Sequence, residues 1–253
     1  MAQEPTKTTK LYKGKITIDF WENRHLYKIR ETGRVPISVT AATGTIDKSR
    51  PLIYWATGLA RDYLIALIGK KKPITEQDVF DAVGLHAVRK KAAATIGSAV
   101  HDWAEQHIKG KKPEMPTDEK VANGVIAFLK WVNEHKIKFL CSEKMVYSKK
   151  YQYVGLMDCS FTMGTEKHKI VHCGDFKTSK GIYPEMRFQV AAYQAADAEE
   201  SDQLYGTKWI IRFDKETGDF EAREFIDHIE DFKGFLGCLA TKKRLKELQK
   251  SNY

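Results

Sequence analysis

Features that define several protein classes are missing from this sequence of 253 residues. It holds four cysteines without any CxxC spacing, which predicts free thiols in a reducing compartment and argues against a disulfide framework or a zinc site. No apolar run approaches the length of a membrane span, and residues 1–15 lack the apolar stretch of a secretion signal. Low-complexity tracts and internal repeats are also missing. These absences favour a soluble, cytoplasmic, globular protein that does not contact a membrane.

Positive charge is in excess. The 42 Lys and Arg residues outnumber the 33 Asp and Glu residues and give a net charge of +9. Single clusters are the usual content of solvated helix ends and turns, but together they favour a polyanion such as a nucleic acid. No GxxxxGK[ST] pattern occurs, so the sequence predicts no P-loop motor. The basic clusters are Lys70–Lys72, Arg89–Lys91, Lys109 with Lys111–Lys112, Lys149–Lys150 and Lys242–Arg244.

The first half of the chain predicts two strands and then helices. Residues 1–12 are interpreted as a polar lead, and residues 15–40 as two strands around an Glu-Asn-Arg turn followed by a Gly-Arg-Val-Pro loop. Helices are expected over 50–69 and from a Thr75/Asp78 capping box to Gly110, with a break at Gly84 or Gly97 as an option. A further helix is expected over 116–135, capped by Thr117. The tryptophans Trp55, Trp103 and Trp131 are expected in the core.

The second half predicts an antiparallel meander of three strands over 136–148, 151–163 and 168–179. A helix begins at Pro184, a strand spans 206–213, and a basic helix spans 233–250. The fold class predicted is α/β, with a central mixed sheet that contains the meander and is flanked by helices.

An acid and a base share one face at the end of the third meander strand. Asp175 and Lys177 are two residues apart, so strand periodicity points both to the same side, opposite Phe176. A hairpin turn at Thr165-Glu166 would place Asp158 opposite Cys173, diagonal to Asp175. The same reasoning sends Met157, Cys159 and Phe161 to the Phe176 side. Two close carboxylates require a cation between them, and Mg²⁺ or Mn²⁺ fits oxygen ligands.

Two helices add polar side chains at helical spacing. His101 and Glu105 lie at i and i+4 on a stripe with Ser98, beside an apolar stripe of Ile96, Val100, Trp103 and His107. Gln189 and Tyr193 show the same i, i+4 spacing on the helix after the lysine strand. Each piece has an ordinary alternative: an exposed Asp175–Lys177 ion pair, a core histidine, a pair on a helix surface.

The order of these residues resembles the RecB-type branch of the PD-(D/E)XK nuclease superfamily. The shared pattern is Gly97-xxx-His101-xxx-Glu105, Gly155-xx-Asp158, Asp175-x-Lys177-Thr178 and Gln189-xxx-Tyr193, over residues 95–213. The segments RHLYKI, VPISVT and LIYWATGLARDY also resemble the start of phage-encoded exonucleases of this branch. The resemblance implies a restriction-endonuclease-like core over 95–213, with strands and helices of 1–94 packed on it and a basic helical extension over 214–253, as one compact domain.

The resemblance also implies roles for individual residues. His101, Asp158, Asp175 and the backbone carbonyl of Phe176 would hold Mg²⁺ or Mn²⁺, and Lys177 would activate the attacking water. Glu105 would be catalytic, as a partner of the metal ligands or a ligand of a second ion, and Glu143 matches a further acidic position. The DNA-contacting residues implied by the resemblance or suggested by charge are Ser98, Thr178, Gln189, Tyr193, Lys90, Lys91 and Arg187; for Arg187, the two lysines and Lys180, solvation is the alternative. For Gln189 and Tyr193, the resemblance implies that they position the DNA backbone or brace Lys177.

Two departures from the family pattern qualify the resemblance. Met157 stands where the superfamily name has proline. Many relatives hold an iron–sulfur cluster with one cysteine before the core and three after it, whereas here Cys141, Cys159 and Cys173 fall inside the core and only Cys238 follows. The sequence therefore predicts no iron–sulfur cluster.

The expected function is a metal-dependent DNA nuclease, an exonuclease rather than a site-specific endonuclease, acting in DNA recombination, repair or phage replication. Single- or double-stranded DNA is the expected partner, with a single-strand annealing or recombination protein as a further candidate, in a bacterial or phage-infected cell. Three alternatives stay open: a DNA-binding recombination partner with little catalysis, a structure-specific endonuclease, and a nuclease of the same fold used in CRISPR adaptation.

Overall fold

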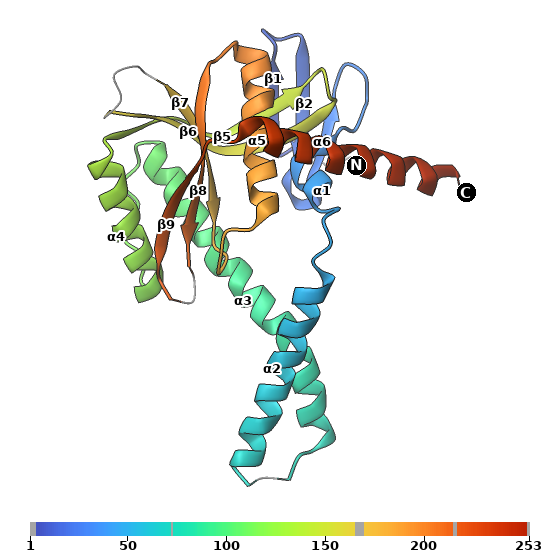
Figure 1. Cartoon of the computed structure of the whole chain (residues 1–253), viewed down its shortest axis with the longest axis vertical. Coiled ribbons are helices and arrows are strands. Elements are labelled where there is room, and N and C mark those ends of the chain that lie inside the picture. Colours follow the sequence, from blue (N-terminus) through green and yellow to red (C-terminus); the bar gives the residue numbers. More distant parts are fainter. Residues whose placement is uncertain (1–3, 72, 165–169, 215–216, 252–253) are drawn as a thin grey trace.

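The fold is a mixed α/β arrangement in which helices flank a six-stranded sheet and a three-stranded sheet stands beside it (Figure 1). It comes from a computed structural model that describes residues 4–71, 73–164, 170–214 and 217–251. A long helical hairpin projects from this body, and the last helix also extends beyond it (Figure 1).

The small sheet is antiparallel, in the order β1–β2–β3. It consists of β1 (Lys7–Leu11), β2 (Ile16–Trp21) and β3 (Leu26–Ile29), with a 3-10 turn at Glu22–Arg24 between the last two. The two expected strands around that turn are confirmed. The expectation of a loose lead over residues 1–12 is wrong, because Lys7–Leu11 pairs with Ile16–Phe20 along the outer edge.

The large sheet is mixed and contains the expected meander. Strands β5 (Ile137–Ser148), β6 (Tyr153–Met163) and β7 (Val171–Lys177) are consecutive and antiparallel. Strand β8 (Tyr205–Phe213) pairs parallel to β7, and β9 (Phe220–Phe225) pairs antiparallel to β8. The short β4 (Ile37–Ser38) pairs parallel to the beginning of β6.

Helices cover both faces of the large sheet (Figure 1). Helix α5 (Pro184–Ser201), with Pro184 in its first turn, connects the parallel strands β7 and β8, and packs with α1 (Val39–Thr43) and α6 (His228–Ser251). Helix α4 (Glu119–Glu134) and the end of α3 (Glu76–Ile108) cover the other face. Helix α2 (Ser49–Gly69) pairs with the first half of α3.

Three apolar clusters hold these layers together. One lies between the sheet and α5, with Val190 and Phe235, and a second lies between the sheet and α3 and α4, with Phe128 and Trp131. The third joins the three-stranded sheet to β5 and β6. Because β6 contributes residues to all three clusters, the middle of the sheet is fixed from every side.

Several details differ from the sequence-based expectations. Asp118, one residue after Thr117, is the N-cap of α4 and accepts the Val121 N–H at 3.1 Å. Trp55 is 36% exposed rather than in the core, whereas Trp103 and Trp131 are buried as expected. Helix α3 continues through both glycines, so the boundary between 94 and 95 falls inside one helix.

Some of the sequence-based expectations fall on residues that the structure does not describe. The turn at Thr165-Glu166 lies outside the described residues, as does Lys72. In the described ranges, every helix is too short or too polar to cross a lipid bilayer.

Candidate active site

Asp158 lies where both neighbours of β6 depart from regular pairing. On one side, Ser142 pairs with Cys159 and Lys144 with Met157, which places Glu143 opposite Asp158, and Glu143 has a φ of +48°. On the other side, the pairing between β6 and β7 ends at the Cys159–Gly174 pair, next to Asp158. A left-handed conformation at a glutamate is uncommon, and irregular strands are frequent beside active sites.

Beyond the last strand pair, the side chain of Asp158 forms the hydrogen bond to β7. Its Oδ2 accepts a hydrogen bond of 2.8 Å from the backbone N–H of Phe176. On that segment of β7, Asp175 is completely buried and forms an ion pair with Lys177. The carboxylates of Asp158 and Asp175 and the ammonium of Lys177 therefore meet at one point, as the sequence predicts.

The charges of this group depend on one another. Burial and the nearby charge of Asp175 raise the pKa of the Asp158 carboxyl well above its usual range, although Lys177 opposes the shift. Burial lowers the pKa of Lys177, but the two aspartates outweigh burial, so the net pKa is raised and the lysine is charged at neutral pH. The lysine thus supplies the positive charge that the two carboxylates require.

The register between β6 and β7 corrects the expected hairpin by two residues. Cys173 lies opposite Ser160, not opposite Asp158, so Asp158 comes level with Asp175 instead of diagonal to it. Met157, Cys159 and Phe161 were expected on the same face of the sheet as Phe176. Cys159 and Phe161 do pack with Phe176, in the apolar cluster under α3 and α4. Met157 packs instead in the cluster under α5, so the expectation is wrong for this residue.

Helix α3 brings His101 to the same point. An imidazole nitrogen, Nδ1, lies 3.9 Å from Asp158 Oδ2, and the ring stands edge-on to Phe176 at 6.0 Å between centroids. Burial, followed by the charge of Lys177, lowers the pKa of His101, which favours the neutral form that binds metals. The close approach needs Gly97, because a Cβ there would lie 2.8 Å from Thr178 Oγ1.

The neighbouring apolar stripe of α3 packs as expected where it can be followed. Val100 and Trp103 are buried in the α3–α4 cluster, and His107 stacks on Trp103 with 5.3 Å between ring centroids. The side chains of Ser98 and Ile96 lie outside the described part of the structure.

A second pair of carboxylates adjoins the first. Burial and the charge of Glu105 raise the pKa of Glu143, and the two side chains contact each other. Glu105 also pairs with Lys109, and Lys7 Nζ donates to the Glu143 carbonyl at 2.9 Å. Glu143, the further acidic residue that the resemblance singles out, therefore lies beside Glu105.

Helix α5 braces the site from the other side of the sheet. Gln189 Nε2 donates to Asp175 Oδ1 at 3.3 Å and to the Tyr193 hydroxyl at 2.9 Å. Tyr193 is buried, and a Cβ at Gly155 would lie 2.4 Å from its Cε1 atom. Of the two roles expected for this pair, the contacts match bracing, and they reach Asp175 rather than Lys177.

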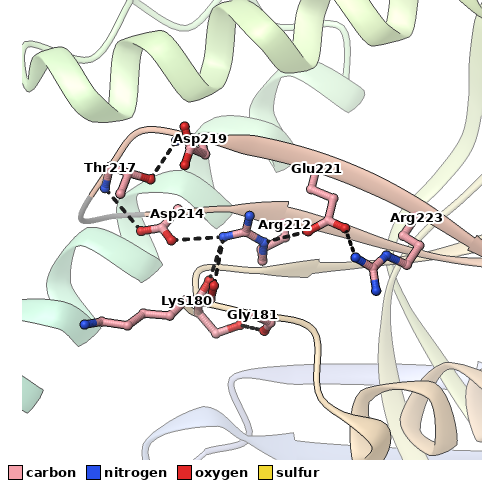
Figure 2. A network of polar contacts seen from close by, with 9 residues as sticks. Lys180, Gly181, Arg212, Asp214, Thr217, Asp219, Glu221 and Arg223 are labelled. Carbon is pink, nitrogen blue, oxygen red and sulfur yellow. Dashed lines mark hydrogen bonds and ion pairs between the residues drawn. The ribbon is translucent and has the colours of Figure 1, made fainter.

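Arg212, which the sequence analysis missed, anchors the loop after Lys177. It lies on β8 opposite Lys177, and its Nη1 donates at 3.3 Å to each of the carbonyls of Ser179 and Lys180 (Figure 2). Asp214 and Glu221 pair with the same guanidinium at 3.0 and 3.1 Å. The only sequence signal was an arginine inside the apolar run Trp209–Phe213.

Other predicted DNA-contacting residues do not gather at the carboxylates. Arg187 pairs with Asp231 of α6 at 3.0 Å and lies over the ring of Phe225, so it connects α5 to its neighbours. Lys90 and Lys91 lie on α3 nearer the tip of the hairpin. Thr178 contacts α3 at Gly97.

The chemistry of the donor set fits a hard divalent cation. Asp158 and Asp175 are acidic oxygen donors in mutual repulsion, His101 is a neutral nitrogen donor, and the buried Asp175 Oδ2 contacts the Lys177 ammonium. In the described residues, no three His, Cys, Asp or Glu side chains gather closely enough to form a complete metal site, and the Lys177 ammonium lies against Asp175.

A cavity of about 360 Å³ lies elsewhere, between the β3–β4 region and α6. Basic side chains of α6, Lys242 and Lys246, contribute to its lining together with His25 and Tyr27. None of the predicted site residues lines it.

Comparison with known proteins adds little to this geometry. No protein-family model and no curated protein matches the sequence. Among solved structures, the chain is similar to the crystal structure of SSO0001, with a TM-score of 0.31 and 9% identity over 51% of this chain. The match spans 62% of the length of that structure, and a likeness this low carries no argument about function.

Proposed function

We propose that this protein is a metal-dependent deoxyribonuclease that hydrolyses phosphodiester bonds, and that it acts as an exonuclease. The observation that carries the proposal is the meeting of Asp158, Asp175, Lys177 and His101 where β6, β7 and α3 come together. An exposed surface ion pair, the ordinary alternative for Asp175 and Lys177, does not account for a completely buried aspartate.

The proposed roles follow from the contacts of each residue. Asp158, Asp175 and His101, with the Phe176 carbonyl, would hold Mg²⁺ or Mn²⁺, which when bound polarises a phosphate oxygen and acidifies a water. Lys177, charged and partly accessible, would orient the attacking water and offset charge that develops on the phosphoryl oxygens. Gln189 fixes the Asp175 carboxylate, and Arg212 fixes the loop after Lys177.

A cleavage assay with end-labelled linear and closed circular DNA, in Mg²⁺, Mn²⁺ or EDTA, tests the proposal. We expect degradation of linear DNA only, abolished by EDTA, with a loss of about 10²–10³-fold in Lys177→Ala. Lys130→Ala on α4 is the matched control, because that lysine is exposed and pairs with Glu134. Binding without cleavage would instead support a recombination partner, and nicking of circles would support an endonuclease.

A further inference from the structure

The first half of α3 exposes an apolar face that the body of the protein leaves uncovered. Helices α2 and α3 contact each other and project away from the sheets (Figure 1). Phe80 and Val83 are each 63% exposed, and Val79 is also exposed. Apolar groups this exposed on one face of a helix indicate a surface that binds a ligand or partner.

The same helix leads from this face toward the candidate active site. An α-helix repeats after 18 residues, or five turns, so Val83 and His101 share one angular position on α3, as do Ala87 and Glu105. Lys90, seven residues after Val83, lies on the same stripe and is exposed. A ligand that follows the stripe from Phe80 would reach His101 after about 30 Å, at 1.5 Å per residue.

We infer that this face of α3, defined by Phe80, Val83, Ala87 and Lys90, is a track along which a single-stranded nucleic acid reaches the candidate site. The inference rests on the proposed nuclease function. A length of about 30 Å accommodates roughly nine nucleotides at the 3.4 Å spacing of a stacked strand.

The composition of the track favours a single strand over a duplex. An exposed aromatic ring stacks on bases, which a single strand offers and a duplex hides within its own stack. Lys90 adds a positive charge on the same stripe, where a phosphate backbone requires one. A second copy of this chain would have to bury the charge of Lys90 at its apolar contact, which is unfavourable.

Binding measured without metal tests the track independently of cleavage. A labelled oligothymidine longer than about nine nucleotides is titrated with protein in EDTA, and fluorescence anisotropy gives Kd. We expect Phe80→Ala to raise Kd about five- to tenfold or more. Val88→Ala is the matched control: Val88 is 65% exposed on the same helix but faces away from the stripe, so its Kd should change no more than about twofold.

Two results would overturn the track. Equal Kd values for Phe80→Ala and Val88→Ala would mean that the stripe does not touch the strand. A wild-type dimer that Phe80→Ala converts to a monomer in sedimentation would mean that the face joins copies of the chain. Failure of the nuclease proposal appears separately, as missing metal-dependent cleavage in a wild-type protein that still shows the Phe80-dependent binding.

Discussion

At the scale of single residues, Asp158 carries the main electrostatic conflict of the molecule. Its carboxyl is buried beside Asp175, and both effects raise its pKa. The contact with the Phe176 N–H and the charge of Lys177 compensate only in part. Without a divalent cation, the ionised pair therefore destabilises the fold, as is common where a site is built for function.

Replacing this charge should stabilise the metal-free protein. In Asp158→Asn the amide oxygen can still accept the Phe176 N–H, while the repulsion from Asp175 disappears. We expect a higher Tm in EDTA, by roughly 2–4 °C for each kcal/mol recovered in a chain of this size. The rise in Tm that Mn²⁺ causes in the wild type should be lost, because a ligand is missing. Differential scanning calorimetry measures both.

Asp19→Asn is the control with the opposite sign. A hydrogen bond from Arg30 lowers the pKa of Asp19, so the folded state favours this charge and the variant should have a lower Tm. If the Asp158→Asn protein has a lower Tm than the wild type in EDTA, the charge of Asp158 does not destabilise the metal-free fold, and this part of the account is wrong.

The sequence predicts the relative position of side chains two residues apart on one strand, but it predicts the relative position of side chains on different strands only in part. Asp175 and Lys177 share a face by period alone, and that expectation holds. A shift of two residues in the pairing of β6 with β7 leaves every side chain on the same face of the sheet. The sequence pattern therefore could not decide whether Asp158 lies opposite Asp175 or opposite Cys173. The role of Arg212 could not be predicted, because its partners, the carbonyls of residues 179 and 180, lie on another segment of the chain.

At the scale of elements, the packing of α5 on β6 depends on Gly155. A Cβ there would meet Tyr193 at 2.4 and 2.9 Å and Val39 at 3.1 Å. Because the Tyr193 ring is buried and bonded to Gln189, α5 would have to move, and Gln189 would move with it away from Asp175. The glycine thus couples helix position to the geometry of the carboxylate.

Gly155→Ala should therefore destabilise the fold by about 1–3 kcal/mol and reduce cleavage. Gly84→Ala on α3 is the contrasting variant, because a Cβ there meets no atom within 4 Å and alanine favours a helix by roughly 1 kcal/mol. Urea denaturation compares the two free energies of unfolding. Similar values for both variants would show that the contact with Tyr193 is not tight.

The strands that the sequence concealed are edge strands. β1 (KTTKL) and β9 (FEAREF) are rich in charged or hydroxyl side chains, which natural sheets place at their edges to prevent association. Such strands have little apolar alternation, so sequence patterns miss them. The helices after residue 49 and the meander, with strong periodicity or capping at Thr75, were predicted to within about five residues, whereas the short α1 was not predicted.

At the scale of the whole molecule, the excess of nine positive charges should govern DNA binding. Each phosphate contact releases counterions, so log Kd rises with log salt in proportion to the number of contacts. Lys90 lies on the proposed track, and removing it should lower the slope by about 0.7 for a single strand. Anisotropy titrations at several salt concentrations measure this.

Lys130→Ala should leave the same slope unchanged, because Lys130 lies on α4 and pairs with Glu134 at 3.8 Å. Equal slopes for the wild type and Lys90→Ala would remove Lys90 from the binding surface.

The shape of the molecule was beyond the reach of local patterns. The sequence predicted the helix over 50–69 and a core position for Trp55, and the resemblance implied that this helix packs on the core, yet α2 has no buried residue and contacts α3 instead. Helical periodicity identifies an apolar face but not what covers it. A surface reserved for a ligand therefore has the same sequence pattern as a core helix.

Anomalous diffraction from crystals soaked in Mn²⁺ tests the central claim most directly. The account predicts one strong peak bonded to carboxylate oxygens of Asp158 and Asp175 and to a nitrogen of His101, with the Lys177 ammonium displaced from Asp175. A peak only at other residues, or none at this point despite Mn²⁺ in excess, would contradict it.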